Sequence, residues 1–250
     1  LRVLGGTGIV FQDMIFHSND CYGSGNDGGV MYAERSSSVE FDRCIFHNNE
    51  SYDHGSVVMW QSRGTLTMKN CLLYENDAGD AAELYIHYDD VTDPSNPVNG
   101  TVNITNCTFA DNKQCNSATV YGAYGTTTLN NCIFYNNTPY YDVSGTITMN
   151  KCMYDAKHSS VTSNNEVSGN PTFANADSDD YRLKFGSTGI DAGDNSYVSG
   201  WSYDLAENAR ISNSTVDLGC YEATSCSEVS DAGSIASAQQ NCGSFDPAAF

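Results

Sequence analysis

Residues 126–137 read TTTLNNCIFYNN, and the same twelve-residue design recurs on both sides of this stretch. Aligned on its cysteine, Cys132, the chain contains five further copies, one of which has methionine in the cysteine position. They are GIVFQDMIFHSN, SVEFDRCIFHNN, TLTMKNCLLYEN, TVNITNCTFADN and TITMNKCMYDAK, anchored on Met14, Cys44, Cys71, Cys107 and Cys152. Successive anchors lie 30, 27, 36, 25 and 20 residues apart. This repetition indicates copies that stack, because one copy alone cannot bury its apolar side.

Two columns of the alignment are apolar in every copy, the second residue after the anchor and the third before it. Before the anchor, apolar and polar residues alternate, which predicts a strand with one buried face; the period slips directly before the anchor, which predicts a bend. No interval holds a helical pattern long enough for a crossover helix. We therefore expect an all-β fold, a parallel β-helix of about six or more coils spaced roughly 4.8 Å apart. The apolar columns are Phe16, Phe46, Leu73, Phe109, Phe134 and Tyr154, and Phe11, Phe41, Met68, Ile104, Leu129 and Met149.

Two further columns are predicted to be structural. Asparagine stands five places after the anchor in five copies, where it suits a left-handed corner and can bond to the asparagine of the next coil. The anchor cysteines are expected to pack as unpaired thiols inside the stack. Zinc is disfavoured, because there is no CxxC pair and one column of ligands does not form a tetrahedron. The two columns are Asn19, Asn49, Asn76, Asn112 and Asn137, and Cys44, Cys71, Cys107, Cys132 and Cys152.

The repeats also resemble a known family. Phe16, Phe46, Phe109 and Phe134 are each followed three places later by Asn, and residues 28–30 read GGV. Over about residues 7–157 these features resemble the FxxN and GGA-type repeats of polymorphic membrane proteins and of bacterial right-handed parallel β-helix surface proteins. The resemblance implies a right-handed winding. It does not choose a function, since such folds include adhesins, stalks, passenger domains and polysaccharide lyases.

The character of the sequence changes after Asn170. The stretch NPTFANADSDDYRLKFGSTGIDAGD and the later DLGCYE resemble the closing segment of many secreted bacterial β-helix proteins. We expect repeats in residues 1–160, last coils and a cap over the open end in 161–222, and a linker or following module in 223–250. In that last part, Cys226 and Cys242 are expected to form a disulfide, which fits an extracytoplasmic, secreted or cell-surface location. The chain is expected to be a fragment of a larger secreted protein.

Charge limits the expected partners. The chain has 11 basic and 31 acidic residues, a net charge of −20, which disfavours nucleic acid and anionic membranes. The sequence contains no run of 18 apolar residues, so it does not predict a membrane-spanning helix. The longest insertion, residues 87–100, predicts a projecting loop in which Asp89, Asp90 and Asp93 are candidate calcium ligands. The alternative for this loop is a solvated turn, and calcium is the one cofactor that the sequence suggests.

One group of residues resembles an active site. Asp191, Asp204 and Arg210, with Asp217 and Glu222, could serve as acid and base in glycoside hydrolysis or, with calcium, in a lyase. The alternative is structural, with Arg210 neutralising carboxylates that are turned inward. We favour the structural interpretation, which leaves enzymatic activity uncertain and a non-enzymatic role preferred.

Two outward columns suggest binding surfaces. His17 and His47 share the position three places after the anchor with Tyr74 and Tyr135, where rings could hold a sugar, or could simply fill outward strand positions. Small hydroxyl and amide side chains form a second array, which could match a crystal or ice surface. That array consists of Thr65, Thr67, Thr101, Asn103, Thr126, Thr128, Thr146 and Thr148.

The sequence as a whole favours a non-enzymatic extracellular adhesin or structural stalk of a larger secreted bacterial protein. Its expected partners are an extracellular glycan or surface protein and other modules of the same chain. The main alternative is a polysaccharide lyase or glycoside hydrolase of the β-helix class, and a minor alternative is an ice-binding surface.

Overall fold

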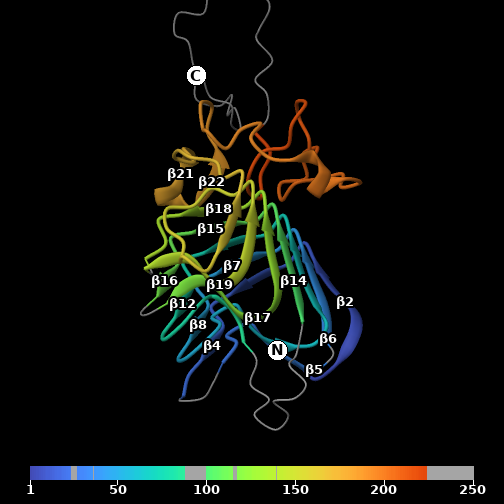
Figure 1. Ribbon diagram of the computed structural model, residues 1–250, viewed down its shortest axis with the longest axis vertical. Helices are drawn as coiled ribbons and strands as arrows, with labels where there is room; N and C mark the ends of the chain where they lie inside the picture. Colours follow the sequence, from blue (N-terminus) through green and yellow to red (C-terminus); the bar gives the residue numbers. More distant parts are fainter. Residues whose placement is uncertain (24–26, 36, 88–99, 115–116, 139, 224–250) are drawn as a thin grey trace, which may run out of the picture.

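The computed structural model describes residues 1–23, 27–35, 37–87, 100–114, 117–138 and 140–223. These residues form six coils, of which the first four contain four short strands each (Figure 1). Coil 1 consists of β1 (Arg2–Val3), β2 (Gly6–Gln12), β3 (Ile15–His17) and β4 (Asp20–Cys21). Coil 2 consists of β5 (Met31–Arg35), β6 (Ser37–Asp42), β7 (Ile45–His47) and β8 (Glu50–Ser51).

The later coils repeat this plan, and in two of them neighbouring strands merge. Coil 3 consists of β9 (Val58–Ser62), β10 (Thr65–Lys69), β11 (Leu72–Tyr74) and β12 (Asp77–Ala78). Coil 4 consists of β13 (Leu84–Ile86), β14 (Thr101–Thr105), β15 (Thr108–Ala110) and β16 (Lys113–Gln114). Coil 5 holds β17 (Ala118–Asn130) and β18 (Ile133–Tyr135), coil 6 holds β19 (Tyr141–Asn150), and β20 (Thr162–Asn164) follows.

Each strand pairs in parallel with the equivalent strand of the next coil, which gives the stack four faces. Face A contains β1, β5, β9, β13 and the first halves of β17 and β19, and face B contains β2, β6, β10, β14, the second halves of β17 and β19, and β20. Face C contains β3, β7, β11, β15 and β18, and face D contains β4, β8, β12 and β16. The all-β parallel solenoid predicted from the repeats is therefore confirmed.

The register of the strands reproduces the columns of the sequence alignment. On face B, Phe41 lies between Phe11 and Met68, and on face C, Phe46 lies between Phe16 and Leu73. The rings stack along the axis: the ring centroids of Phe16 and Phe46 are 5.1 Å apart with planes 8° from parallel. The columns thus form one continuous apolar core, in which each coil covers the apolar side of the next.

Two non-glycine residues with positive φ build the corners in each of coils 1 to 5, and coil 6 has the first of them alone. One directly precedes the anchor, and the other stands four places after it. The asparagines five places after the anchor are not among them, so the expectation that these asparagines adopt the left-handed conformation was wrong. A left-handed residue one place earlier turns the chain and leaves the asparagine free to point inward. The residues with positive φ are Asp13, Arg43, Asn70, Asn106, Asn131 and Lys151 before the anchor, and Ser18, Asn48, Glu75, Asp111 and Asn136 after it.

The inward asparagines form a hydrogen-bonded ladder. The side-chain amide of each one donates to the Oδ1 of the next: Asn19 to Asn49 at 2.8 Å, Asn49 to Asn76 at 2.8 Å, Asn76 to Asn112 at 3.0 Å and Asn112 to Asn137 at 3.0 Å. Each Oδ1 also accepts the backbone N–H of the preceding asparagine. The ladder therefore satisfies polar groups that the corner would otherwise bury unpaired.

The anchor cysteines are free and buried in the core. Burial raises the pKa of Cys107 above its ordinary value, as expected for a thiol in apolar surroundings. Cys226 and Cys242, proposed to form a disulfide, and Asp89, Asp90 and Asp93, proposed to bind calcium, lie outside the described residues. No helix in the described ranges is both long and apolar enough to cross a lipid bilayer.

The C-terminal segment, residues 165–223, packs against the side of the coils. It contains β21 (Phe173–Asn175), the 3₁₀ turn η1 (Ala176–Ser178), β22 (Asp180–Leu183) and the 3₁₀ turn η2 (Asn195–Val198). It lies along one side of the coils, beside β15 and β18 (Figure 1). Beyond coil 6 the core is instead covered by Val161, which precedes β20. Val161 and β20 thus continue the stack beyond coil 6, as expected for the last coils, whereas polar groups of residues 165–223 bond to the corners of coils 3 to 5.

Candidate functional site

The outer surface of face B carries three rows of uncharged polar side chains. Adjacent members of a row belong to successive coils and are paired in register, so each row runs along the axis of the stack. The rows are Thr65, Thr101 and Thr126; Thr67, Asn103, Thr128, Thr148 and Thr162; and Thr105, Asn130, Asn150 and Asn164.

The third row is held by its own hydrogen bonds. The amide of Asn164 donates to Oδ1 of Asn150 at 2.9 Å, and that of Asn150 donates to Oδ1 of Asn130 at 2.9 Å. The amide of Asn130 donates in turn to Oγ1 of Thr105 at 3.3 Å. This second ladder fixes the orientation of its side chains before any ligand binds. Thr105 and Asn130 are only 8% exposed, so Asn150 and Asn164 are the members open to a ligand.

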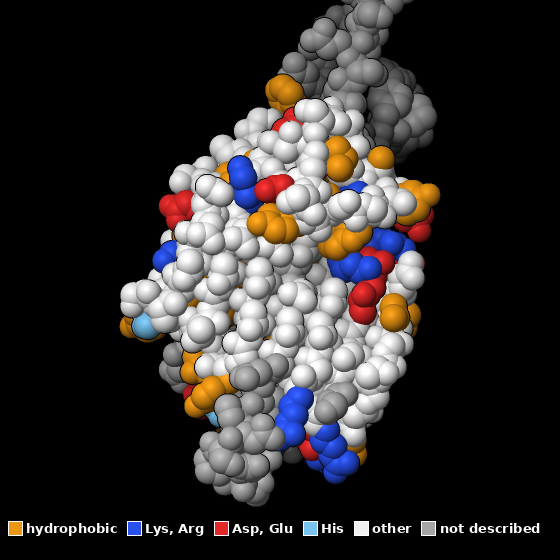
Figure 2. Space-filling model, turned by 45° about the vertical axis from the view of Figure 1, so that its right-hand side comes forward, with side chains coloured by type: hydrophobic (Ala, Val, Ile, Leu, Met, Phe, Trp, Pro, Cys, Tyr) orange, Lys and Arg blue, Asp and Glu red, His pale blue; other side chains and the backbone are white. Residues whose placement is uncertain are grey.

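The outward side chains of face B are regularly spaced, and most of them are uncharged. Neighbouring coils repeat about every 4.8 Å, and outward residues on one strand about every 6.6 Å. In Figure 2, the middle of the molecule is an expanse of uncharged polar side chains and backbone, with charged side chains at its margins. At the β6 and β10 end, Lys69 pairs with Glu40 at 2.6 Å and lies 3.7 Å from Asp42. In a chain of net charge −20, this surface suits a neutral ligand rich in hydroxyl groups.

The predicted ligand-binding column on face C is arranged differently. The rings of His17, His47 and Tyr74 stack in succession, with centroids 5.1 and 5.0 Å apart and planes within 9° and 7° of parallel. The ring of Tyr181 covers Tyr74, and that of Phe173 lies edge-on against Tyr135. Neighbouring rings therefore cover the ring faces of His47 and Tyr74 that a sugar would need.

The residues that resembled an active site form a buried network. Arg210 is 1% exposed, and its Nη2 donates to Oε2 of Glu222 at 2.8 Å. Its Nη1 donates to Oδ1 of Asn70 at 3.0 Å and to the carbonyl of Gly219 at 3.2 Å. Burial raises the pKa of Glu222 to about 7, although the charge of Arg210 acts in the opposite direction. This guanidinium joins the C-terminal segment to coil 3.

The carboxylates beside Arg210 accept hydrogen bonds from backbone N–H groups. Asp204 is fully buried and accepts N–H groups from Ala206, Asn208 and Glu222 at 2.7 to 2.9 Å. Asp217 accepts N–H groups from Asp191 at 2.7 Å and Ala223 at 2.6 Å, and burial raises its pKa.

Asp191 is exposed, and its carboxylate accepts from the side-chain amide of Asn213. Asp204 and Arg210 thus share one network, and Asp191 lies at its margin. Substrate could reach the two buried members only if the segment moved.

Sequence reasoning missed the residues that attach the C-terminal segment. Asn106 donates to the carbonyls of Asp217 at 2.8 Å and Gly219 at 3.1 Å. Asn70 donates to the carbonyl of Tyr203 at 3.2 Å, and Asn131 donates to the carbonyl of Asp194 at 3.1 Å. A signal was present, because asparagine directly precedes the anchor in these three consecutive coils alone.

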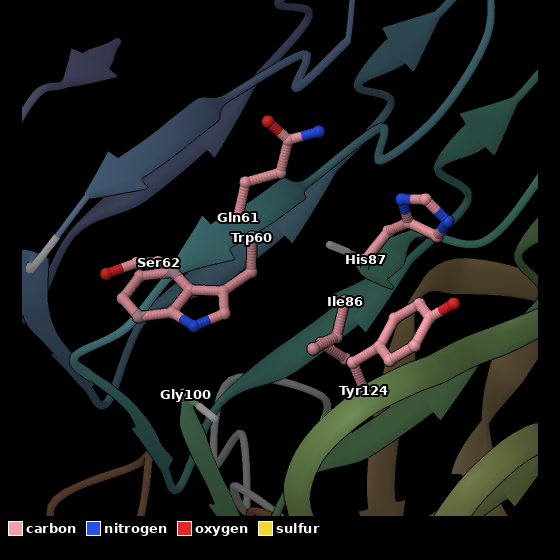
Figure 3. Close-up of a pocket in the computed structure, with 7 residues that line it drawn as sticks. All are labelled: Trp60, Gln61, Ser62, Ile86, His87, Gly100 and Tyr124. Atoms are coloured by element: carbon pink, nitrogen blue, oxygen red, sulfur yellow. The ribbon is translucent and has the colours of Figure 1, made fainter. Parts of the chain in front are cut away.

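Face A carries a small notch beside the end of β13 (Figure 3). Its volume of about 10 Å³ is enough for one water molecule at most. The indole N–H of Trp60, which is 1% exposed, finds no hydrogen-bond partner among the described residues. The lining residues are Trp60, Gln61, Ser62, Ile86, His87, Gly100 and Tyr124. Across the part of the chain that the structure describes, no three His, Cys, Asp or Glu side chains are grouped to hold a metal ion.

The comparison with protein families agrees with this architecture. Residues 4–92 match the family model of the right-handed β-helix region. The match spans coils 1 to 3 and reaches β13, and it agrees with the right-handed winding expected from the repeats. No curated protein and no solved structure matched the chain.

Proposed function

We propose that this chain is a non-catalytic binding module of a secreted or surface-exposed bacterial protein, and that face B binds a neutral, elongated glycan. The observation that carries the proposal is the in-register array of hydroxyl and amide groups on this face. An elongated ligand can contact several coils at once, and each coil offers it similar donors and acceptors. Residues 1–160 would supply the binding rod and 161–222 its side support.

Three features support a neutral glycan over other partners. Thr and Asn side chains provide both donors and acceptors, which hydroxyl groups need in equal measure. The rows themselves carry no charge, and Glu40 and Lys69, which continue the second and third rows, are paired with each other. The asparagine ladder reduces the conformational entropy lost on binding, because its side chains are already fixed.

The enzymatic alternative has less support from the geometry. A lyase needs a basic residue close to the abstracted proton. On face B, Lys69 is engaged by Glu40, and at the adjoining corner Arg43 donates to both carboxylate oxygens of Asp13 at 2.8 and 2.9 Å. The Arg210 network is buried, and both Nη atoms of Arg210 donate to the protein, although among the described residues its Nε has no partner. A lyase or hydrolase therefore remains the alternative for the experiment to detect.

The test measures binding and turnover together. The purified chain is incubated, with and without calcium, with insoluble neutral and anionic polysaccharides. Retention on each polymer is measured by co-sedimentation, and products are followed as reducing ends and as unsaturated sugars. A Thr128→Glu, Thr148→Glu variant places two charges on face B. The control, Ser144→Glu, places a charge on face A of the same strand as Thr148.

We expect retention on at least one neutral polymer, loss of retention in the face B variant, and unchanged retention in the control. Retention that survives the face B substitutions would reject this face as the site. Product formation would establish the enzymatic alternative and direct mutagenesis to Asp191, Asp204 and Arg210. No retention on any polymer would contradict glycan binding and favour a stalk or a protein partner.

The regular spacing of the threonines supports a second candidate, binding to an ice or crystal surface. Thr65, Thr101 and Thr126 form one row and Thr67 and Thr128 belong to the next, so that the hydroxyls define a two-dimensional grid. Asn103 and Thr148 extend the second row. Thermal hysteresis measured at high protein concentration tests this candidate, and its absence would reject it.

A further inference from the structure

We propose that His17 and His47 form a chelating pair for a divalent transition metal such as Zn²⁺, Cu²⁺ or Ni²⁺. The two residues are directly paired in register between β3 and β7. Their rings are stacked with centroids 5.1 Å apart and planes 9° from parallel. The site lies on face C, where the C-terminal segment reaches Tyr74 but leaves His17 exposed.

The two Nε2 atoms are suitable ligands. Within the described residues, the structure gives hydrogen bonds only to the Nδ1 atoms: that of His17 lies 3.4 Å from Oγ of Ser18, and that of His47 lies 3.0 Å from Nδ2 of Asn48. Imidazole is a preferred ligand of zinc, copper and nickel. Bond lengths of about 2.0 Å at one metal ion require the Nε2 atoms to approach to roughly 3 Å. Because each Nε2 lone pair lies in its ring plane, both rings must rotate out of the parallel stack before the lone pairs converge on one ion, and the broad χ2 torsion of histidine permits part of this rotation.

The surroundings favour a cation at this position. The carboxylates of Glu75 and Asp179 both act on the charge of His47. Tyr74 stacks on the other face of His47, so metal binding must also turn the His47 ring out of this contact.

Ser18 and Asn48, which lie against the Nδ1 atoms, provide another test of the same site. A metal on Nε2 leaves the ring proton on Nδ1, which must then donate. The Ser18 hydroxyl can accept this proton as it stands, whereas the amide of Asn48 must turn to present its oxygen. An Asn48→Asp substitution would provide a permanent acceptor and should therefore tighten metal binding. Two protein ligands leave the remaining coordination positions to water.

The experiment uses the full chain and Zn²⁺ alone, followed by NMR of the imidazole resonances and by isothermal titration calorimetry. We expect the resonances of His17 and His47 to change together at a stoichiometry of one. His17→Gln and His47→Gln should each abolish that titration, because a chelate needs both rings. His158→Gln, in which a histidine outside the pair is replaced, is the matched control and should leave it unchanged.

Several outcomes would overturn the proposal. One is a change at only one of the two rings, and another is a His17→Gln variant that binds Zn²⁺ as the wild type does. Binding that disappears only when cysteines are blocked, with both imidazole resonances unmoved, would place the metal on thiolates instead. Ca²⁺ added in place of Zn²⁺ should leave both rings unchanged, because calcium takes oxygen ligands. Circular dichroism of each variant shows that the fold is retained.

Discussion

Asn137 donates its side-chain amide to the carboxylate of Asp142 at 3.1 Å, and this bond ends the inner asparagine ladder. The same carboxylate accepts the backbone N–H groups of Asp155 at 2.8 Å and Ala156 at 3.1 Å. Lys157 stands where the next ladder asparagine would be, so Asp142 takes over the role of acceptor. The ladder therefore closes with a side chain from the start of coil 6.

Asp142→Ala should lower the free energy of unfolding by about 3 kcal/mol, because three donors lose their partner in a buried site. Urea denaturation followed by circular dichroism measures the change. Asp155→Ala is the matched control, since it removes a neighbouring exposed carboxylate, and it should have little effect. Equal stability of the two variants would show that the ladder does not depend on its last acceptor.

Asn106→Gly should lower the free energy of unfolding by about 2 kcal/mol, because two carbonyls of the C-terminal segment lose a buried donor. Glycine keeps the positive φ of this corner, so the backbone is not strained. Asn136→Gly makes the same change at an exposed residue with positive φ whose amide bonds to Asp111. Hydrogen exchange in residues 165–223 should rise in the first variant and stay unchanged in the second.

Glu222 should make stability depend on pH. Its folded-state pKa, raised by burial to about 7 from an ordinary value of 4.5, means that the folded protein binds this proton more tightly than the unfolded chain does. The contribution is complete below the unfolded pKa and is lost as the pH rises through the folded pKa, at a limiting slope of about 1.4 kcal/mol per pH unit. The unfolding free energy of the wild type, relative to Glu222→Gln, should therefore fall across this range. Parallel curves would show that Arg210 keeps the carboxylate ionised throughout.

The anchor thiols should resist alkylation in the folded protein. Cys71, Cys107 and Cys132 are buried, and burial raises their pKa values, so that little thiolate forms and reagent cannot reach it. Cys21 is only half-buried and serves as the internal control. Mass spectrometry after brief treatment with iodoacetamide should find Cys21 modified and the anchor cysteines intact, whereas all should react in urea. Modification of Cys107 at the rate of Cys21 would contradict this packing.

Most of the stack was predictable because its side chains repeat in register. The alignment that placed Phe41 over Phe11 and Met68 over Phe41 is the pairing found between β2, β6 and β10. The backbone conformation at the corners was harder to predict from the sequence. Asn at five places after the anchor and Asn directly before it look alike in sequence, yet only the second set has positive φ.

The position of the C-terminal segment could not be predicted from its own residues. Its polar pattern fits a cap as well as a side support, and the choice depends on partners far away in sequence, such as Asn70 for Arg210. The ring column on face C was misleading for a related reason. His47 and Tyr74 are outward-facing in sequence, but in-register pairing brings their faces together.

The side position of the C-terminal segment has a mechanical consequence. Hydrogen bonds between coils run along the axis, so tension applied along the axis loads one junction at a time and opens coils in succession. Coils 3, 4 and 5 are also joined through Asn70, Asn106 and Asn131 to a single stretch of chain. The junctions between coils 3, 4 and 5 can therefore open only when their bonds to this stretch break as well. Under load, the rod should therefore yield first at coils 1 and 2 and keep its braced middle intact.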